Sequence, residues 1–389
     1  MGRSSGRRKS HTSPAMKKET AAACKAAAQE ARRKDRPKEE QVAVNKWKAT
    51  GDPEAAAYEM RLRDEQLELF GCMEKERWHM RSEDSSPGRD AEAVWADLYR
   101  SGFKDRMHGS YEDTTAFRAM RFTDVEPERA AACPTGTLQV FWFTVAAIAE
   151  ELQWPLDVYG LIAVRDHLDR NRNIVFARAR DNCQTITAED PYLTLTGPSR
   201  AAVLNDVSNS VRFEVVQKVK GATNESEDKD LSFLASKYKT WKWHTHAIHY
   251  VDTSKLCKLE WTFGNLAKSV EATINIQVIH GSWPDGYRGI FSASTISLAD
   301  MKAGLLSVED GKLPLTVDGM IKLSRHVVCV EIEGELIISV ATEYTNMAQV
   351  TTKDEIVFTP KTAGRSCAIL DVFSCRMKVI VAWSLVCEY

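Results

Sequence analysis

Short, strand-like runs fill this chain from about residue 137 to its end, and they constrain the fold more than any other feature. Gly, Pro, Asn and Asp, the residues typical of turns, separate the runs. Residues 270–278 show the pattern clearly, because apolar side chains at even positions alternate with Glu, Thr, Asn and Gln at odd ones. A period of two predicts a half-buried antiparallel strand. We expect strands at 156–164, 174–177, 192–196, 211–219, 257–263, 269–279, 290–296, 327–332, 336–344, 355–359 and 377–385.

The order of these runs predicts a mainly β domain, either an antiparallel β-sandwich or a distorted barrel. No strand–helix–strand alternation, which would build a parallel sheet, is found. Residues 138–152 are long enough for a helix, but Phe141, Phe143 and Val145 alternate as in a strand, which we favour. Glu333-Gly334 separates two apolar runs and predicts a tight hairpin.

The N-terminal part has a different composition, which predicts a charged, helical and partly disordered region. Residues 1–50 hold 14 Lys and Arg against 5 Asp and Glu, whereas the rest of the chain holds 38 against 49. We expect a basic, Ala-rich, disordered to helical leader at 1–50, short helices and a linker at 51–110, an irregular connector at 111–134, and the β-rich domain at 135–389. The leader could contact nucleic acid or an anionic surface, or be a solvated tail.

The number and spacing of the cysteines indicate the cellular compartment of the protein. There are nine, never spaced as CxxC, and Cys329 lies in an apolar run typical of a buried core. An odd, unpaired set without a signal-peptide pattern predicts a cytoplasmic or nuclear location. The most apolar stretch, 138–148, is too short to cross a bilayer, so we expect no transmembrane segment.

Three histidines form the first candidate site. His244 and His246 would project from the same face of a strand, a spacing at which two imidazoles can share a zinc or copper ion, and His249 is a third candidate ligand. The alternative is an exposed strand or loop whose other face carries Trp241 and Trp243. No carboxylate or cysteine stands nearby at a ligand spacing, which favours the alternative.

Acidic and aromatic loops provide two further candidates. The run 224–230 could bind calcium with Asp166, Asp169 and Asp181, but it lacks the glycine and spacing of an EF-hand loop, and a solvated turn is favoured.

In the loop 282–289, Trp283, Tyr287 and Arg288 suit a binding surface for protein, sugar or base, although packing within a turn would also explain them. Gly197-Pro198 lacks the frame of a phosphate-binding loop and indicates a turn, and Cys183 is expected to be structural.

Several motifs together resemble one family of grass-lineage plant proteins, defined by a β-rich domain of unknown function. The motifs are 154–166, 180–184, 195–198, 227–229, 270–274, 323–325, 358–360 and 377–384, and 52–70 and 111–122 resemble the leader of that family. The resemblance implies a β-rich fold and a plant source but assigns no catalytic residue. In some members the domain follows a ribosome-inactivating N-glycosidase, whose Glu has no counterpart in residues 116–122, so we expect no such activity.

The sequence therefore favours a non-enzymatic binding or protein-interaction module without a cofactor. This rests on the lack of a recognisable nucleophile, acid–base pair or phosphate loop. A protein partner is favoured. The alternatives are a metal-dependent enzyme using His244, His246 and His249, and a calcium-dependent membrane-binding module.

Overall fold

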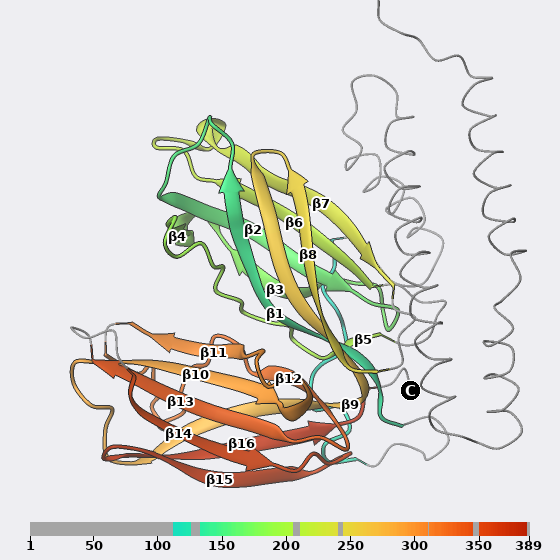
Figure 1. Cartoon of the computed structure of the whole chain (residues 1–389), viewed down its shortest axis with the longest axis vertical. Coiled ribbons are helices and arrows are strands. Elements are labelled where there is room, and N and C mark those ends of the chain that lie inside the picture. Colours follow the sequence, from blue (N-terminus) through green and yellow to red (C-terminus); the bar gives the residue numbers. More distant parts are fainter. Residues whose placement is uncertain are drawn as a thin grey trace, which may run out of the picture. The chain divides into compact units, whose positions relative to one another are not determined.

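Antiparallel strands make up nearly all of the regular structure in the computed structural model, which describes residues 112–125, 133–204, 211–239, 244–309, 311–344 and 350–386 (Figure 1). These residues all belong to one compact unit, 80–389. The strands are β1 (Thr135–Ile148), β2 (Leu156–Arg165), β3 (Asn173–Arg178), β4 (Gln184–Ile186), β5 (Ala202–Val203), β6 (Val211–Val219), β7 (Lys229–Tyr238), β8 (His246–Ser254), β9 (Cys257–His280), β10 (Tyr287–Thr295), β11 (Ala303–Val308), β12 (Val327–Glu331), β13 (Leu336–Tyr344), β14 (Val350–Phe358), β15 (Arg365–Val372) and β16 (Cys375–Ser384). Three short 3-10 helices join them: η1 (Arg180–Asn182), η2 (Glu225–Glu227) and η3 (Ile296–Leu298).

The first half of the unit is a sandwich, which we call the N-terminal sandwich. Its first sheet has the order β3-β2-β6-β7, with β4 also paired to β2. Its second layer is formed by β1, β5, β8 and the first half of β9. The core between the layers is rich in aromatic rings, including Phe143 stacked on Trp261 at 5.5 Å.

Both open sides of the N-terminal sandwich are bridged, which gives it the character of a barrel. On one side the segment 191–197 links the layers, because Leu193 N–H donates to the carbonyl of Phe143 on β1 and Thr196 N–H to that of Val175 on β3. On the other side the Ser254 hydroxyl of β8 bonds the main chain of Phe233 on β7. The predicted class of antiparallel sandwich or distorted barrel is confirmed.

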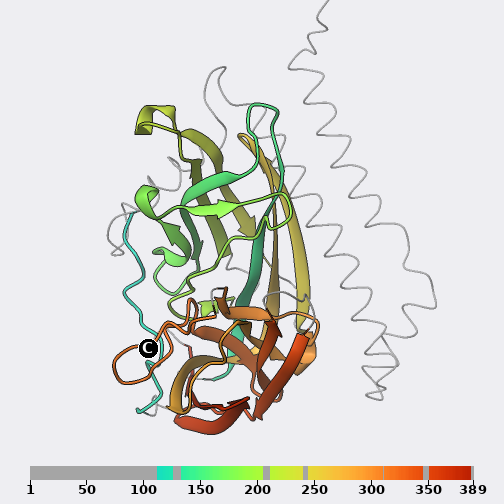
Figure 2. The same cartoon turned by 90° about the vertical axis from the view of Figure 1, so that its left-hand side faces the viewer.

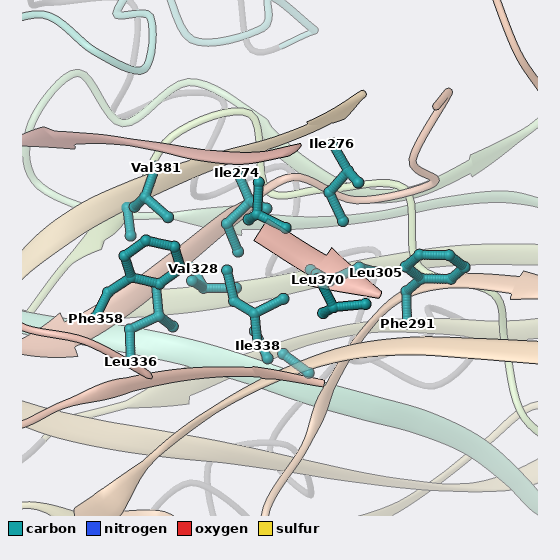
Figure 3. Packing of buried hydrophobic residues seen from close by; sticks show 14 of the residues in the cluster. Ile274, Ile276, Phe291, Leu305, Val328, Leu336, Ile338, Phe358, Leu370 and Val381 are labelled. Carbon is teal, nitrogen blue, oxygen red and sulfur yellow. The ribbon is translucent and has the colours of Figure 1, made fainter. Parts of the chain in front are cut away.

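The second half forms a C-terminal sandwich with its own core. A four-stranded sheet, β11-β10-β13-β14, faces β12, β15, β16 and the second half of β9. Figure 3 shows the buried residues converging from both sheets, and burial of each such side chain stabilises the fold by about 1.5–3 kcal/mol. The labelled residues are Ile274, Ile276, Phe291, Leu305, Val328, Leu336, Ile338, Phe358, Leu370 and Val381.

Strand β9 runs through both sandwiches and changes its inward face at a bulge. Residues 257–263 contribute odd-numbered side chains to the N-terminal core, whereas residues 270–276 contribute even-numbered ones to the C-terminal core. The pairing with β1 shifts between Leu266 and Ser269, and Lys268 there has a positive φ of 46°. The extra residue moves the alternation by one position. The sequence predicted two strands here because the bulge interrupts the pattern.

Two sequence predictions on local structure have different outcomes. Residues 138–148 lie in strand β1, as favoured. The hairpin at Glu333-Gly334 is wrong: a turn is present, with Gly334 N–H donating to the Glu331 carbonyl at 3.0 Å, but β12 pairs with β9 while β13 pairs with β10 and β14. The turn carries the chain from one sheet to the other. The predicted helical leader lies outside the described residues.

Residues 112–125 form no strand or helix, yet they bond to both sandwiches (Figure 2, teal). Ala116 N–H donates to the carboxylate of Asp169 near the N-terminal sandwich. The Thr123 hydroxyl donates to the carbonyl of Trp383 on β16 of the C-terminal sandwich. The predicted irregular connector is thus attached along its described length. No helix within the described ranges is long and apolar enough to cross a membrane.

Candidate functional site

The three histidines do not come together. The rings of His244 and His246 lie 5.2 Å apart, but the His246 Nδ1 is 2.9 Å from the His244 carbonyl. His249 is exposed on β8 and its Nδ1 is 2.8 Å from the Thr262 hydroxyl. Odd separation on a strand directs His246 and His249 to opposite faces. Among the described residues no group of three or more His, Cys, Asp or Glu side chains could hold a metal.

Asp228 is the carboxylate of the acidic loop that is held by the most protein groups. Asp228 accepts hydrogen bonds from Arg180 (2.8 and 3.0 Å), the Tyr159 hydroxyl (2.5 Å) and Gly221 N–H (2.7 Å). The hydrogen bonds from Arg180 hold the pKa of Asp228 well below its usual range, while burial and the Asp228 hydrogen bond raise the pKa of Tyr159 to about 12. Hydrogen bonds from the rest of the protein therefore fix the loop at Asp228, so it is not simply a solvated turn.

Two of the other calcium candidates, Asp166 and Asp169, bind an arginine, whereas Asp181 is exposed in η1. Arg200 is about 1% exposed and its five N–H groups all have acceptors. Nε donates to Thr115 Oγ1 (2.9 Å), Nη1 to Asp166 (2.6 Å) and the Ala201 carbonyl (2.9 Å), and Nη2 to Asp166 (2.9 Å) and Asp169 (3.1 Å). Burial alone would raise the pKa of Asp166, but the Arg200 guanidinium holds it below its usual value. A cation at Asp166 and Asp169 would have to displace Arg200.

Glu271 lies at the joint between residues 112–125 and the two sandwiches. Its oxygens accept N–H groups from Met120 (2.8 Å) and Ala201 (2.7 Å). Burial raises its pKa in spite of these bonds. A pocket of about 10 Å³, room for one water, lies beside Glu271 and Arg200. Both hydrogen bonds of Glu271 come from main-chain N–H groups of separate segments, so this polar joint fits a structural role.

The aromatic loop builds a surface that we call the aromatic patch, defined as Tyr287, Tyr344 and Phe373. The Tyr287 ring lies 5.2 Å from that of Tyr344 and 4.9 Å from that of Phe373. Tyr344 is 40% exposed and Phe373 48% exposed. The rings come from both sheets of the C-terminal sandwich, because Tyr287 and Tyr344 are a cross-strand pair of β10 and β13 and Phe373 lies in the β15–β16 turn.

The other two residues predicted in this loop have different roles. Trp283 is buried, packs on Phe291 at 5.7 Å and donates its indole N–H to the Tyr287 carbonyl at 3.0 Å. It therefore supports Tyr287 rather than offering a contact surface. Arg288 is half-exposed and lies 3.8 Å from Glu309, a weak surface pair.

The turn that carries Phe373 is strained. It joins Val372 to Cys375 with two residues, and Phe373 adopts a φ of +52°, a conformation that bulky side chains rarely take. Gly281 lies against this turn, since a Cβ at Gly281 would be 2.0 Å from the Ser374 carbonyl oxygen. Backbone strain of this kind concentrates at functional sites, so the turn is a candidate for a functional role.

Sequence reasoning missed Tyr344 and Phe373. Tyr344 ends a correctly predicted strand, and only the pairing of β13 with β10 places it beside Tyr287. Phe373-Ser374 has none of the Gly, Asn or Asp that normally mark a hairpin turn. An aromatic residue between two strand-like runs was the one available signal.

A two-sandwich all-β unit of this kind is matched by one family model. The family, described as "Domain of unknown function (DUF6598)", matches residues 137–381, and the chain belongs to it. The prediction of a C-terminal domain of unknown function is thereby confirmed. A search of the curated proteins finds no match.

Solved structures of one human enzyme give remote likenesses. Human GIVD cytosolic phospholipase A2 is matched with a TM-score of 0.20 and 8% identity, over 66% of this chain and 30% of that chain. The same human enzyme in complex with methyl gamma-linolenyl fluorophosphonate is matched with a TM-score of 0.21 and 9% identity, over 65% of this chain and 32% of that one. This chain thus spans about a third of the phospholipase, and TM-scores of this size do not establish a shared fold.

Proposed function

We propose that this protein is a non-enzymatic protein-interaction module whose partner binds the aromatic patch. The observation that carries the proposal is the exposure of two rings, Tyr344 and Phe373, which both pack on the half-buried ring of Tyr287, and Phe373 lies in a strained turn. Exposed Tyr and Phe side chains over a buried support are typical of the residues that dominate protein–protein binding energies. The ring of Tyr287 is tilted by 67° from that of Tyr344 and by 50° from that of Phe373, so the three rings form no flat surface. Such a surface suits the protruding side chains of a protein partner better than the flat face of a sugar or base.

The charge beside the patch indicates the chemistry of the partner. Asp285 is exposed, lies two residues before Tyr287 and forms no ion pair among the described residues. An unpaired carboxylate two residues from Tyr287 favours a cationic side chain on the partner, which can bind a carboxylate and also stack on a ring. We therefore expect a partner segment that presents an apolar side chain beside a Lys or Arg.

We also propose that the protein resides in the cytoplasm or the nucleus. The described cysteines are all free thiols, which supports a reducing cytoplasmic or nuclear location: Cys133, Cys183, Cys257, Cys329, Cys367 and Cys375. The sequence resemblance supports a grass-lineage plant source and a relation to chains that carry an N-glycosidase ahead of this domain. Imaging of the tagged full chain in plant cells tests the location, and an extracellular signal would contradict it.

Site-specific photo-crosslinking tests the patch. A photoreactive phenylalanine analogue is placed at Tyr344 in the full chain, and in a matched control at Ile290, a 47% exposed residue on the same sheet. The proposal predicts discrete protein adducts from position 344 and none from position 290. Adducts from both positions, or from neither, would contradict it.

A further inference from the structure

Strand β15 is an open edge of the C-terminal sandwich. It is the last strand of its sheet, and among the described strands it pairs with β16 alone (Figure 1). The Asp371 N–H of β15 donates to the Asp354 carboxylate on β14 at 2.9 Å, so it points away from β16. In an antiparallel strand every second residue turns its N–H and C=O to the same side. The main-chain groups of Cys367 and Ile369 therefore also point outward, and they have no main-chain partner among the described residues.

This edge lacks the protection that edge strands of native proteins normally carry. Strands β3 and β11 accept main-chain N–H groups from neighbouring segments, at the carbonyls of Val175 and Leu305. Strand β14 carries three consecutive charged residues at 353–355. The middle of β15, residues 366–370, has no charged residue, proline or glycine, and Ile369 there is 45% exposed. Such an edge is a template for a further strand.

The charges on β15 indicate which strand would fit. Arg365 stands at one end and Asp371 at the other, and both side chains are about half exposed. They lie three residues to either side of Ala368. When two copies of β15 are aligned antiparallel about Ala368, Arg365 lies opposite Asp371 of the second copy, and the two-fold symmetry repeats this pair. The same alignment places Cys367 opposite Ile369 of the second copy, so an apolar centre lies between two pairs of opposite charge.

We propose that this protein forms a two-fold dimer in which the β15 strands of two copies pair and continue the sheet from one copy into the other. The outward main-chain groups would exchange about four hydrogen bonds across the axis. The exposed pairs of Arg365 with Asp124 and of Asp371 with Arg376 would then meet across the interface. None of the paired residues belongs to the aromatic patch, so the dimer goes beyond the proposed function. Because edge pairing buries little surface, the dimer should dissociate on dilution.

Sedimentation velocity of the full chain tests the dimer. With a Kd of about 10 µM, the protein would change from mostly one copy at about 1 µM to mostly two copies at roughly 100 µM. Ile369→Lys puts a charge on the edge at an exposed position, so this variant should stay monomeric at both concentrations. Ile290→Lys, the same change at a 47% exposed residue of β10, should dimerise like the wild type. A wild type that is monomeric at both concentrations, or a dimer that Ile369→Lys leaves unchanged, would overturn the proposal.

Charge reversal tests the alignment of the two strands. Arg365→Asp would place like charges opposite each other at both ends of the pairing and should weaken the dimer by about tenfold. Adding Asp371→Arg to the same chain reverses each pair, so the double variant should return to within about threefold of the wild-type affinity. A double variant that dimerises as weakly as Arg365→Asp would overturn the proposed two-fold pairing, since a strand from another protein would not regain its fit.

Discussion

Replacing Arg200 with methionine should be among the most damaging single changes in this protein. The substitution keeps the aliphatic stem but removes five hydrogen bonds, and it leaves Asp166 and Asp169 without their shared cation. The Asp166 side chain has no exposed surface and would keep only the N–H groups of Leu168 and Val203. Removing one partner of a buried ion pair costs about 3–5 kcal/mol.

The effect is large enough to measure by urea and thermal unfolding at pH 7. For a unit of this size, about 3–5 kcal/mol corresponds to a fall in Tm of roughly 6–20 °C. Asp166→Asn in the Arg200→Met background should recover part of the loss, because it removes the unpaired buried charge. Arg376→Met, which breaks an exposed pair with Asp371, is the matched control. A Tm for Arg200→Met equal to that of the control would refute the structural role of the buried network.

Three further predictions concern other positions. Burial raises the pKa of Glu271 in the native state above its ordinary value of 4.5, so the folded protein keeps this proton more firmly than the unfolded chain does. The stability that this proton contributes should therefore be lost as the pH rises from about 4.5 through the raised pKa. Denaturation at several pH values should show that this loss is absent in Glu271→Gln. Phe373→Gly should stabilise the β15–β16 turn by about 1 kcal/mol in urea unfolding while abolishing crosslinks from the patch, and a destabilised variant would contradict the strain argument. Gly160→Ala should lower the Tm, since its Cβ would meet the Val216 carbonyl, and an unchanged Tm would show that the strand adapts.

The local pattern predicted those strands that alternate strongly. Residues 211–219 and 336–344 have the bounds expected from the sequence, because apolar and polar side chains alternate and turn residues flank them. Strand β7 was missed because Lys229, Asp230 and Lys237 dilute its pattern. Residues 192–196 form only an isolated bridge at Tyr192.

The local sequence pattern does not predict which strands pair or which distant side chains come into contact. The turn after Glu331 was recognised, but nothing local shows that its two strands belong to different sheets. The partners of Asp166 and Glu271 lie far away in the chain, so a calcium site and a buried joint look alike in the sequence. His246 and His249 were grouped by spacing, whereas strand geometry separates them.

The central claim is that the aromatic patch binds a protein partner, and its most direct test is the affinity of the crosslinked partner for patch variants. Titration calorimetry would compare the wild-type chain with Tyr344→Ala and with Ile290→Ala, whose substituted residues are both exposed on the four-stranded sheet. A ring at the centre of an interface contributes about 2 kcal/mol or more, so Tyr344→Ala should weaken binding by about thirtyfold. Ile290→Ala should stay within about threefold of wild type. Equal affinities for Tyr344→Ala and wild type would contradict the account.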